Sequence, residues 1–260
     1  MTQELTHART LADAIYDALP VPSLAHDAGA VLCVNAEGRR VLEADSGDGI
    51  LGRPLAELVH PDAREAGMQR RSLLAEHGGV MFGVPVKLVS SLGNTFQARG
   101  AAAAFAYGDS TAVVVSACDA ATDICVSGPR VLPPRAGADV SVAEAALDAF
   151  PLPVIAVHDF RVAYVNYSAV SLLRAKAPGD IEGRRVTDIV HPDMRSAVLT
   201  LFRGGLAERS GMRERPAKAL ALNGTTIHAM GTGSFLRVDG STFGMWVVTG
   251  ARCEGVTRRQ

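Results

Sequence analysis

The sequence has only four cysteines among its 260 residues, and their spacing is informative mainly by what it excludes. They form no CxxC pair, and no group of them has the spacing of a zinc site. A disulfide framework and a structural zinc centre are therefore not expected, and buried or idle thiols are. The four residues are Cys33, Cys118, Cys125 and Cys253.

The sequence also lacks an excess of basic charge and any long apolar run. Lys and Arg number 26 against 27 Asp and Glu, which gives a formal net charge of −1. No segment offers the clustered positive charge that attracts a phosphate backbone, so direct binding of nucleic acid is not expected. No apolar run approaches the roughly 18 residues of a membrane-spanning helix, and the first ten residues have no apolar signal core. We expect a cytoplasmic protein without membrane association.

An internal repeat is the main feature that the sequence does have. "LVHPDAR" at residues 58–64 returns as "IVHPDMR" at residues 189–195, an offset of 131. With that offset, 18 of the 48 positions in 17–64 are identical to those in 148–195, without a gap. The match weakens afterwards but keeps its frame, since Lys87 still falls on Lys218. A period of this length is the size of a domain, so the chain contains two copies of one domain.

Each copy predicts the same order of elements. Two short apolar segments are followed by short helical stretches, one longer helix and three extended segments separated by Gly and Asn turn signals. This order predicts two α+β domains, each an antiparallel sheet of about five strands with its helices on one face. We expect an N-terminal helix over 1–19, a first domain over 20–118, a linker and connecting helix over 119–147, a second domain over 148–250 and a tail over 251–260.

The repeated motifs have a structural interpretation that needs no catalysis. Asn35 and Asn166 end the second strand of each copy, where each can cap the following helix. His60 and His191 precede a proline suited to a first helical turn, and are interpreted as caps or hinges. Asp62 and Asp193 then fall where a carboxylate meets the positive end of a helix dipole. One His and one Asp two residues apart form no recognised ligand pattern, so no metal site is expected.

The N-terminal segment carries an apolar seam with helical spacing. The seam predicts a helix with one apolar stripe, too short to be a stable free coiled coil. A second subunit could cover it, which favours a homodimer through this helix, and packing on its own sheet is the competing interpretation. The seam consists of Leu5, Ala8, Ala12, Ile15 and Leu19.

The ordered motifs resemble the PAS family of sensory domains. The segments that carry the resemblance are "DALPVP…VLCVNAEGRRVL…ILGRPLAELVHPDAR" and "DAFPLPVIAVHDFRVAYVNYSAVSLL…IEGRRVTDIVHPDMR". It covers roughly residues 17–118 and 148–250. The resemblance implies a sheet with a helical lid over an internal pocket, and a role in sensing or dimerisation. For this pocket, the candidate lining residues are Met68, Phe82, Tyr164, His228 and Trp246.

The cofactor-binding branches of this family differ from the present sequence. The cysteine motif of the light-sensing flavin branch is missing, because Cys33 falls on the second strand. No His lies inside either long helix, where the haem-binding branch has its ligand. Aromatic residues are only 5% of the chain, which leaves few stacking partners for a flavin. We therefore expect no cofactor, and either a small apolar ligand or none.

Two functions remain open. The first is a sensory or regulatory tandem module that binds a small ligand or a partner protein, with an output protein or domain beyond it. Residues 254–260, "EGVTRRQ", are either a charged tail or resemble the opening of LuxR-type DNA-binding domains, which would make the chain the input half of a transcriptional regulator. The alternative is a PAS-fold enzyme acting on a small apolar substrate. Its candidate acid–base residues are His158, Asp159, Tyr164 and His228, although no catalytic set is apparent in the sequence.

Overall fold

A computed structural model describes residues 10–27, 29–44, 49–108, 110–117, 141–204 and 212–253. It contains two five-stranded antiparallel sheets with helices, as the sequence predicts. None of the described helices combines the length and the hydropathy that crossing a bilayer requires. Leu5, Ala8, Cys118, Cys125 and residues 254–260 lie outside the described residues.

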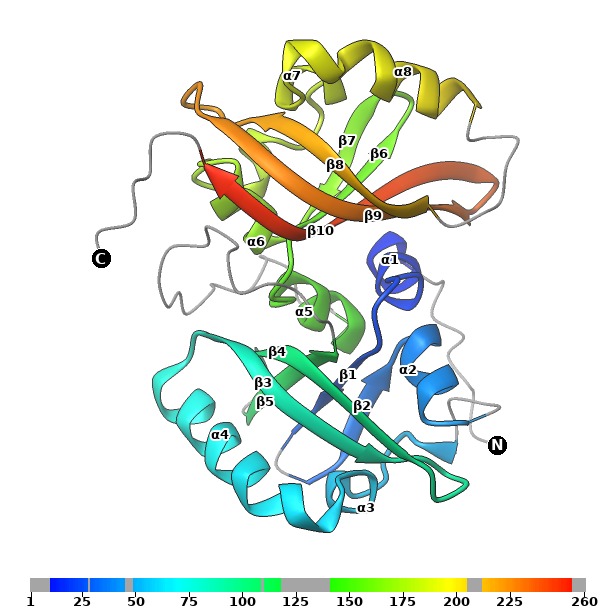
Figure 1. Ribbon diagram of the computed structural model, residues 1–260, viewed down its shortest axis with the longest axis vertical. Helices are drawn as coiled ribbons and strands as arrows, with labels where there is room; N and C mark the ends of the chain where they lie inside the picture. The colour runs from blue at the N-terminus through cyan, green and yellow to red at the C-terminus, as the bar shows by residue number, and fades with distance from the viewer. Residues whose placement is uncertain are drawn as a thin grey trace.

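The first domain follows the predicted order of elements (Figure 1). Its strands pair in the order β2-β1-β5-β4-β3, so the first hairpin and the last three strands meet at β1 and β5. The elements are α1 (Leu11–Asp17), β1 (Ser23–His26), β2 (Val31–Val34), α2 (Ala36–Val41), α3 (Leu55–Leu58), η2 (Pro61–Ala63), α4 (Arg64–His77), β3 (Val80–Val89), β4 (Thr95–Tyr107) and β5 (Ser110–Ala117).

The second domain repeats this architecture, with strand order β7-β6-β10-β9-β8. Its elements are α5 (Val142–Asp148), β6 (Val154–His158), β7 (Arg161–Val165), α6 (Tyr167–Leu172), η3 (Pro178–Asp180), α7 (Val186–Ile189), η4 (Pro192–Met194), α8 (Arg195–Gly204), β8 (Met212–Leu220), β9 (Thr226–Val238) and β10 (Ser241–Cys253). The helices α1 and α5 begin and end 131 residues apart, and so do β4 and β9. The frame of the repeat therefore persists through the part of the sequence where identity is weak.

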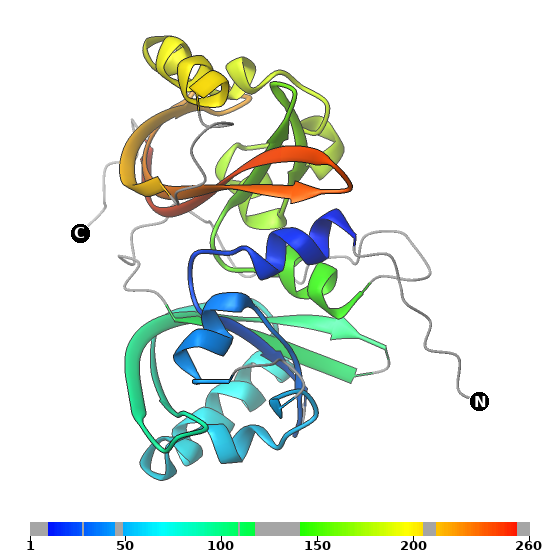
Figure 2. The same ribbon diagram turned by 90° about the vertical axis from the view of Figure 1, so that its right-hand side faces the viewer.

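The two sheets face each other across the helices α1 and α5 (Figures 1 and 2). Strand residues alternate between faces, so each sheet has a second apolar face besides the one under its own helices. α1 lies against β9 of the second domain, and α5 lies against β4 of the first. The result is one hydrophobic cluster that we call the shared core. Its fully buried members include Ile15, Leu19, Leu147, Phe150 and Leu152, with Val114 from the first sheet and Val247 from the second.

The predicted apolar seam of the N-terminal helix is covered within the chain. Ala12, Ile15 and Leu19 are buried in the shared core, at 5%, 0% and 1% exposure. The helix starts at Leu11 because Thr10 caps it, and the side chains and backbones of Thr10 and Asp13 form a reciprocal capping box. These three seam residues therefore have a partner without a second subunit. Self-association of the chain stays a prediction.

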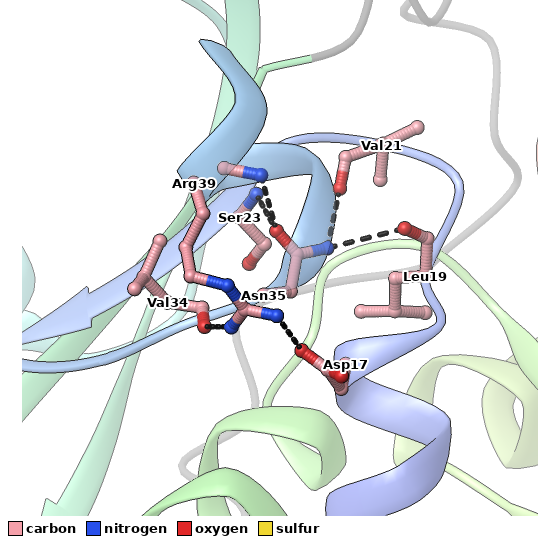
Figure 3. Close-up of polar contacts among 8 residues, drawn as sticks. Asp17, Leu19, Val21, Ser23, Val34, Asn35 and Arg39 are labelled. Carbon is pink, nitrogen blue, oxygen red and sulfur yellow. Dashed lines mark hydrogen bonds and ion pairs between the residues drawn. The ribbon is translucent and has the colours of Figure 1, made fainter. Parts of the chain in front are cut away.

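A buried asparagine joins three elements in the first domain (Figure 3). Asn35 is fully buried, and its Oδ1 accepts hydrogen bonds from the N–H groups of Ser23 and Gly38, both at 2.8 Å. Its Nδ2 donates to the carbonyls of Val21 at 2.8 Å and Leu19 at 3.1 Å. The predicted helix cap is confirmed. The same side chain also fixes the segment that leads from α1 into β1.

The second domain uses its asparagine in the same way. Asn166 is also fully buried, and its Oδ1 accepts from the N–H of Val154 at 2.9 Å and of Ala169 at 3.0 Å. Its Nδ2 donates to the carbonyls of Leu152 at 2.8 Å and Phe150 at 3.1 Å. Each asparagine side chain thus accepts hydrogen bonds from backbone N–H groups and donates hydrogen bonds to backbone carbonyls at a bend in the chain, which an apolar residue cannot do.

Replacing Asn166 with alanine should destabilise the protein strongly. The change leaves several buried backbone groups without partners, so we expect a loss of about 3 kcal/mol in the free energy of unfolding. The matched control is Asn223→Ala, which removes an exposed asparagine from a turn and should cost about 0.5 kcal/mol or less. Chemical denaturation of both variants measures the difference, and equal losses would contradict the role given to Asn166.

Candidate ligand cavity in the second domain

A cavity of about 380 Å³ lies between the second sheet and its covering helices α6, α7 and α8. This volume is within the range of small-molecule sites in proteins, which are about 300–1,000 Å³. The walls are almost entirely apolar. From the sheet they include Ile155, Ala217, Ala219, Phe235, Gly244, Trp246 and Val248, and from the helices Leu172, Ile189, Leu201 and Phe202.

Aromatic rings and glycines shape one end of this cavity. Phe202 on α8 packs edge-on against Phe235 on β9, with 6.1 Å between ring centroids. A Cβ atom at Gly244 would collide with the Phe202 ring, so this position requires glycine while that ring stays in place. On the neighbouring strand, a Cβ at Gly231 would lie 2.5 Å from Nε1 of Trp246. Glycine therefore lets the two aromatic side chains lie close to the sheet.

Among the described residues, three polar side chains border the cavity, and none of them is acidic. Thr200 lies on α8, and Arg215 and Lys218 lie on β8. A desolvated ion would find little compensation among the other walls, which consist of carbon atoms for the most part. The arrangement suits a ligand with an apolar body.

The equivalent space in the first domain is nearly closed. A cavity of about 20 Å³ lies there, and seven of its eleven lining residues are counterparts, at the offset of 131, of residues that line the second-domain cavity. Side-chain size on the edge strand contributes to the difference. Val86 and Leu88 occupy the positions that Ala217 and Ala219 have in the second domain. The same backbone therefore surrounds one open interior and one filled interior.

Charged and polar residues replace apolar ones elsewhere in the first domain's interior. His26 is 4% exposed and stands where the second domain has Val157. Its Nδ1 lies 2.9 Å from the carbonyl oxygen of Asp27. Arg71 stands where the second domain has Phe202, and its Nε is a buried donor without a hydrogen-bond partner among the described residues. Burial lowers the pKa of His26, the Asp27 carbonyl opposes this, and the charge of Arg71 lowers it further.

The five pocket candidates from the sequence lie in different places. Trp246 lines the cavity. Tyr164 is buried in the shared core, where its hydroxyl donates to Asp148 at 2.6 Å. Met68 on α4 is 64% exposed, Phe82 is half-buried on β3, and His228 is exposed on β9. His228 lies between the buried residues Ile227 and Ala229, so alternation along the strand turns it away from the interior.

The repeated His-Pro-Asp segment attaches the helices to the edge strand. The N–H of His60 donates to the carbonyl of Lys87 at 3.0 Å, and Lys87 Nζ lies 2.5 Å from Asp62 Oδ2. This ion pair lowers the pKa of Asp62. His60 contacts Asp62 through Nδ1 and makes no side-chain cap, so its interpretation as a cap is wrong.

The second copy differs in that one respect. His191 Nδ1 accepts from the N–H of Asp193 at 3.4 Å, so here the histidine is a cap. Its own N–H donates to the carbonyl of Lys218 at 3.0 Å, and Lys218 Nζ lies 3.4 Å from Asp193 Oδ2. The shared frame of Lys87 and Lys218 was visible in the sequence, but their pairing with the aspartates was not.

The acid–base residues proposed for an enzyme do not come together at the cavity. His158 stacks on Phe243 with 4.7 Å between ring centroids, and its Nδ1 lies 2.9 Å from the carbonyl oxygen of Thr242. Neither His158 nor Asp159 lines the cavity. Burial raises the pKa of the Cys33 thiol to about 11, which disfavours a reactive thiolate. Within the described residues, no three His, Cys, Asp or Glu side chains gather as a metal site would require.

Replacing His26 with valine, the residue at the equivalent second-domain position, should change the pH dependence of stability. The folded state keeps His26 neutral because its pKa is lowered from 6.5, whereas the unfolded chain takes up a proton near that value. Stability contributed by neutral His26 is therefore lost as pH falls from 6.5 toward the folded pKa.

Denaturation of both proteins at about pH 7.5 and pH 5.5 measures this effect. We expect the variant to lose less stability on acidification than the parent. The same loss in both proteins would show that His26 does not titrate as described.

Comparison with family models and with curated proteins gives no match. Solved structures that resemble the chain include the PAS domain of a protein from Colwellia psychrerythraea, at 14% identity and TM-score 0.35 over 39% of this chain and 87% of that one. The PAS domain of an HTR-like protein from Haloarcula marismortui has 13% identity and a TM-score of 0.36, over 42% of this chain and 86% of that one. A PAS domain from a two-component sensor histidine kinase has 14% identity and a TM-score of 0.33, over 40% of this chain and 88% of that one.

The assignment of the fold rests on the element order and the sheet topology. Each half of the chain has a strand pair, a group of short helices, one longer helix and three further strands, as the resemblance in the sequence implies. Both halves close these strands into one five-stranded antiparallel sheet. The chain is thus a protein of two PAS-like domains in tandem.

Proposed function

We propose that the chain is a sensory or regulatory module whose second domain binds a small apolar ligand. The observation that supports this proposal is the cavity of about 380 Å³ under α7 and α8. A space of this size with apolar walls costs stability when it is empty, because its lining lacks packing partners. The first domain, with its filled interior, is proposed as the platform on which the second acts.

A change in the cavity can reach the first domain through the second sheet. On β10, Trp246 lines the cavity, while the next residue, Val247, belongs to the shared core. On β6, Ile155 lines the cavity, and Ala156 belongs to the shared core. A ligand that moves these strands also changes the packing around α1 and α5. Its effect is limited to its difference in affinity for the two arrangements.

The output partner of this module is a further part of the proposal. A protein partner whose affinity depends on the relative position of the two domains would respond to the ligand. Self-association of the chain and a role in transcription stay predictions, because residues 254–260, which carry the resemblance to a regulator, lie outside the described residues.

The cavity can be filled by replacing two of its lining residues with their counterparts from the first domain. The double substitution Ala217→Val with Ala219→Leu places the side chains of Val86 and Leu88 in the second domain. Trp246 is the single tryptophan of the chain and lines the cavity, so its fluorescence reports on this site. We expect 1-decanol, a neutral apolar probe, to change this fluorescence saturably in the parent. The double variant should bind at least about tenfold more weakly, since each buried CH₂ is worth about 0.8 kcal/mol.

The control is Ala106→Val, which enlarges an exposed alanine on β4 and should leave binding unchanged. The double variant should remain folded, because its side chains fill space instead of creating it. Equal binding by the parent and the double variant, or no saturable binding by the parent, would contradict the proposed site.

A further inference from the structure

Positive charge at the cavity is not balanced by acidic lining residues. In the described part of the chain, Arg215 and Lys218 are the charged side chains that border it, and both lie on β8. Arg215 and Lys218 differ in whether each already forms an ion pair within the chain. Their separate roles show which one is available to a ligand.

Lys218 has a role that does not involve the cavity. It pairs with Asp193 at 3.4 Å and so holds the His-Pro-Asp segment against the sheet. Its first-domain counterpart, Lys87, pairs with Asp62 in the same way, although the interior beside it is filled. A residue present in both domains with the same partner belongs to the common framework.

Arg215 cannot be assigned to this common framework. It shares a face of β8 with Ala217 and Ala219, which form part of the cavity wall, because alternate strand residues point the same way. Its side chain is exposed although the residue lines the cavity, so we place the guanidinium where the cavity meets solvent. Its first-domain counterpart is Val84, a buried apolar residue. In the part of the chain that the structure describes, no ion pair joins Arg215 to another side chain, and none of the cavity-lining residues is acidic.

We infer that the ligand is an amphipathic monoanion, with an apolar body in the cavity and one carboxylate at Arg215. This inference rests on the proposed function and names the chemical class of its ligand. The planar guanidinium can donate two parallel hydrogen bonds, one to each oxygen of a carboxylate, in a bidentate pair. The apolar walls exclude a second charge deeper inside, since a buried ion without a partner is strongly unfavourable. Among the described residues, Arg215 is thus the cavity-lining cation without an ion pair, and it matches one anionic group.

Two probes with the same chain length test the inference. Decanoate and 1-decanol differ only in the head group, and both can be titrated into the full chain while Trp246 fluorescence is followed. We expect the parent to bind decanoate more tightly than Arg215→Gln does, by about fivefold or more, as for a partly exposed charged pair. Affinity for 1-decanol should agree within about twofold between the two proteins, since the neutral head group makes no ion pair.

Arg237→Gln is the matched control, because it removes the same charge from an exposed position on β9 that does not line the cavity. It should leave decanoate binding unchanged. Equal loss of decanoate affinity in Arg237→Gln and Arg215→Gln would overturn the inference in favour of a general effect of charge. Binding of both probes that is unaffected by Arg215→Gln would also overturn it and would leave the apolar site standing. No binding of either probe to the parent would contradict the proposed function itself.

Discussion

The shared core between the two sheets is the constraint on which the rest of the structure depends. Each sheet has an apolar face that its own lid of helices does not cover, and burial of such a face is the main driving force of folding. α1 and α5 cover both faces at once, and each reaches a strand of the opposite domain. A hydrogen bond from Ser141 Oγ to Asp13 Oδ1, at 2.5 Å, joins the two helices at their N-termini. The repeated halves thereby become parts of one packed unit.

The buried asparagines hold this unit in register. Asn35 and Asn166 bind the backbone between a core helix and the first strand of its sheet, so the helix cannot slide without breaking buried hydrogen bonds. With the same framework in both domains, the side chains that line each interior influence how much space it leaves. Alanines on β8 leave space beneath α8, whereas Val86 and Leu88 on β3 fill it. The two copies of the domain thus differ in the space that their interiors leave.

The sequence predicts the parts of this account that depend on local pattern. The repeat frame, the strand and helix order, the turns at Gly93 and Gly224 (both with φ of 85°) and the asparagine caps all follow from residue types at fixed spacing. The coverage of α1 by the second domain does not, because an apolar stripe does not identify its partner. The resemblance in the sequence implies an internal pocket, but not which domain has the larger one, since its volume depends on side chains contributed by elements far apart in the chain. Trp246 could be proposed for its size, whereas Arg215 becomes notable only beside Val84 in the aligned repeat.

The central claim is that the two PAS-like domains form one cooperative unit through the shared core. Differential scanning calorimetry of the full chain tests it most directly, because it compares the calorimetric enthalpy of unfolding with the van't Hoff enthalpy. The account predicts a single transition in which the two enthalpies agree. Two separable transitions, or a calorimetric enthalpy about twice the van't Hoff value, would show that the domains unfold independently and would contradict it.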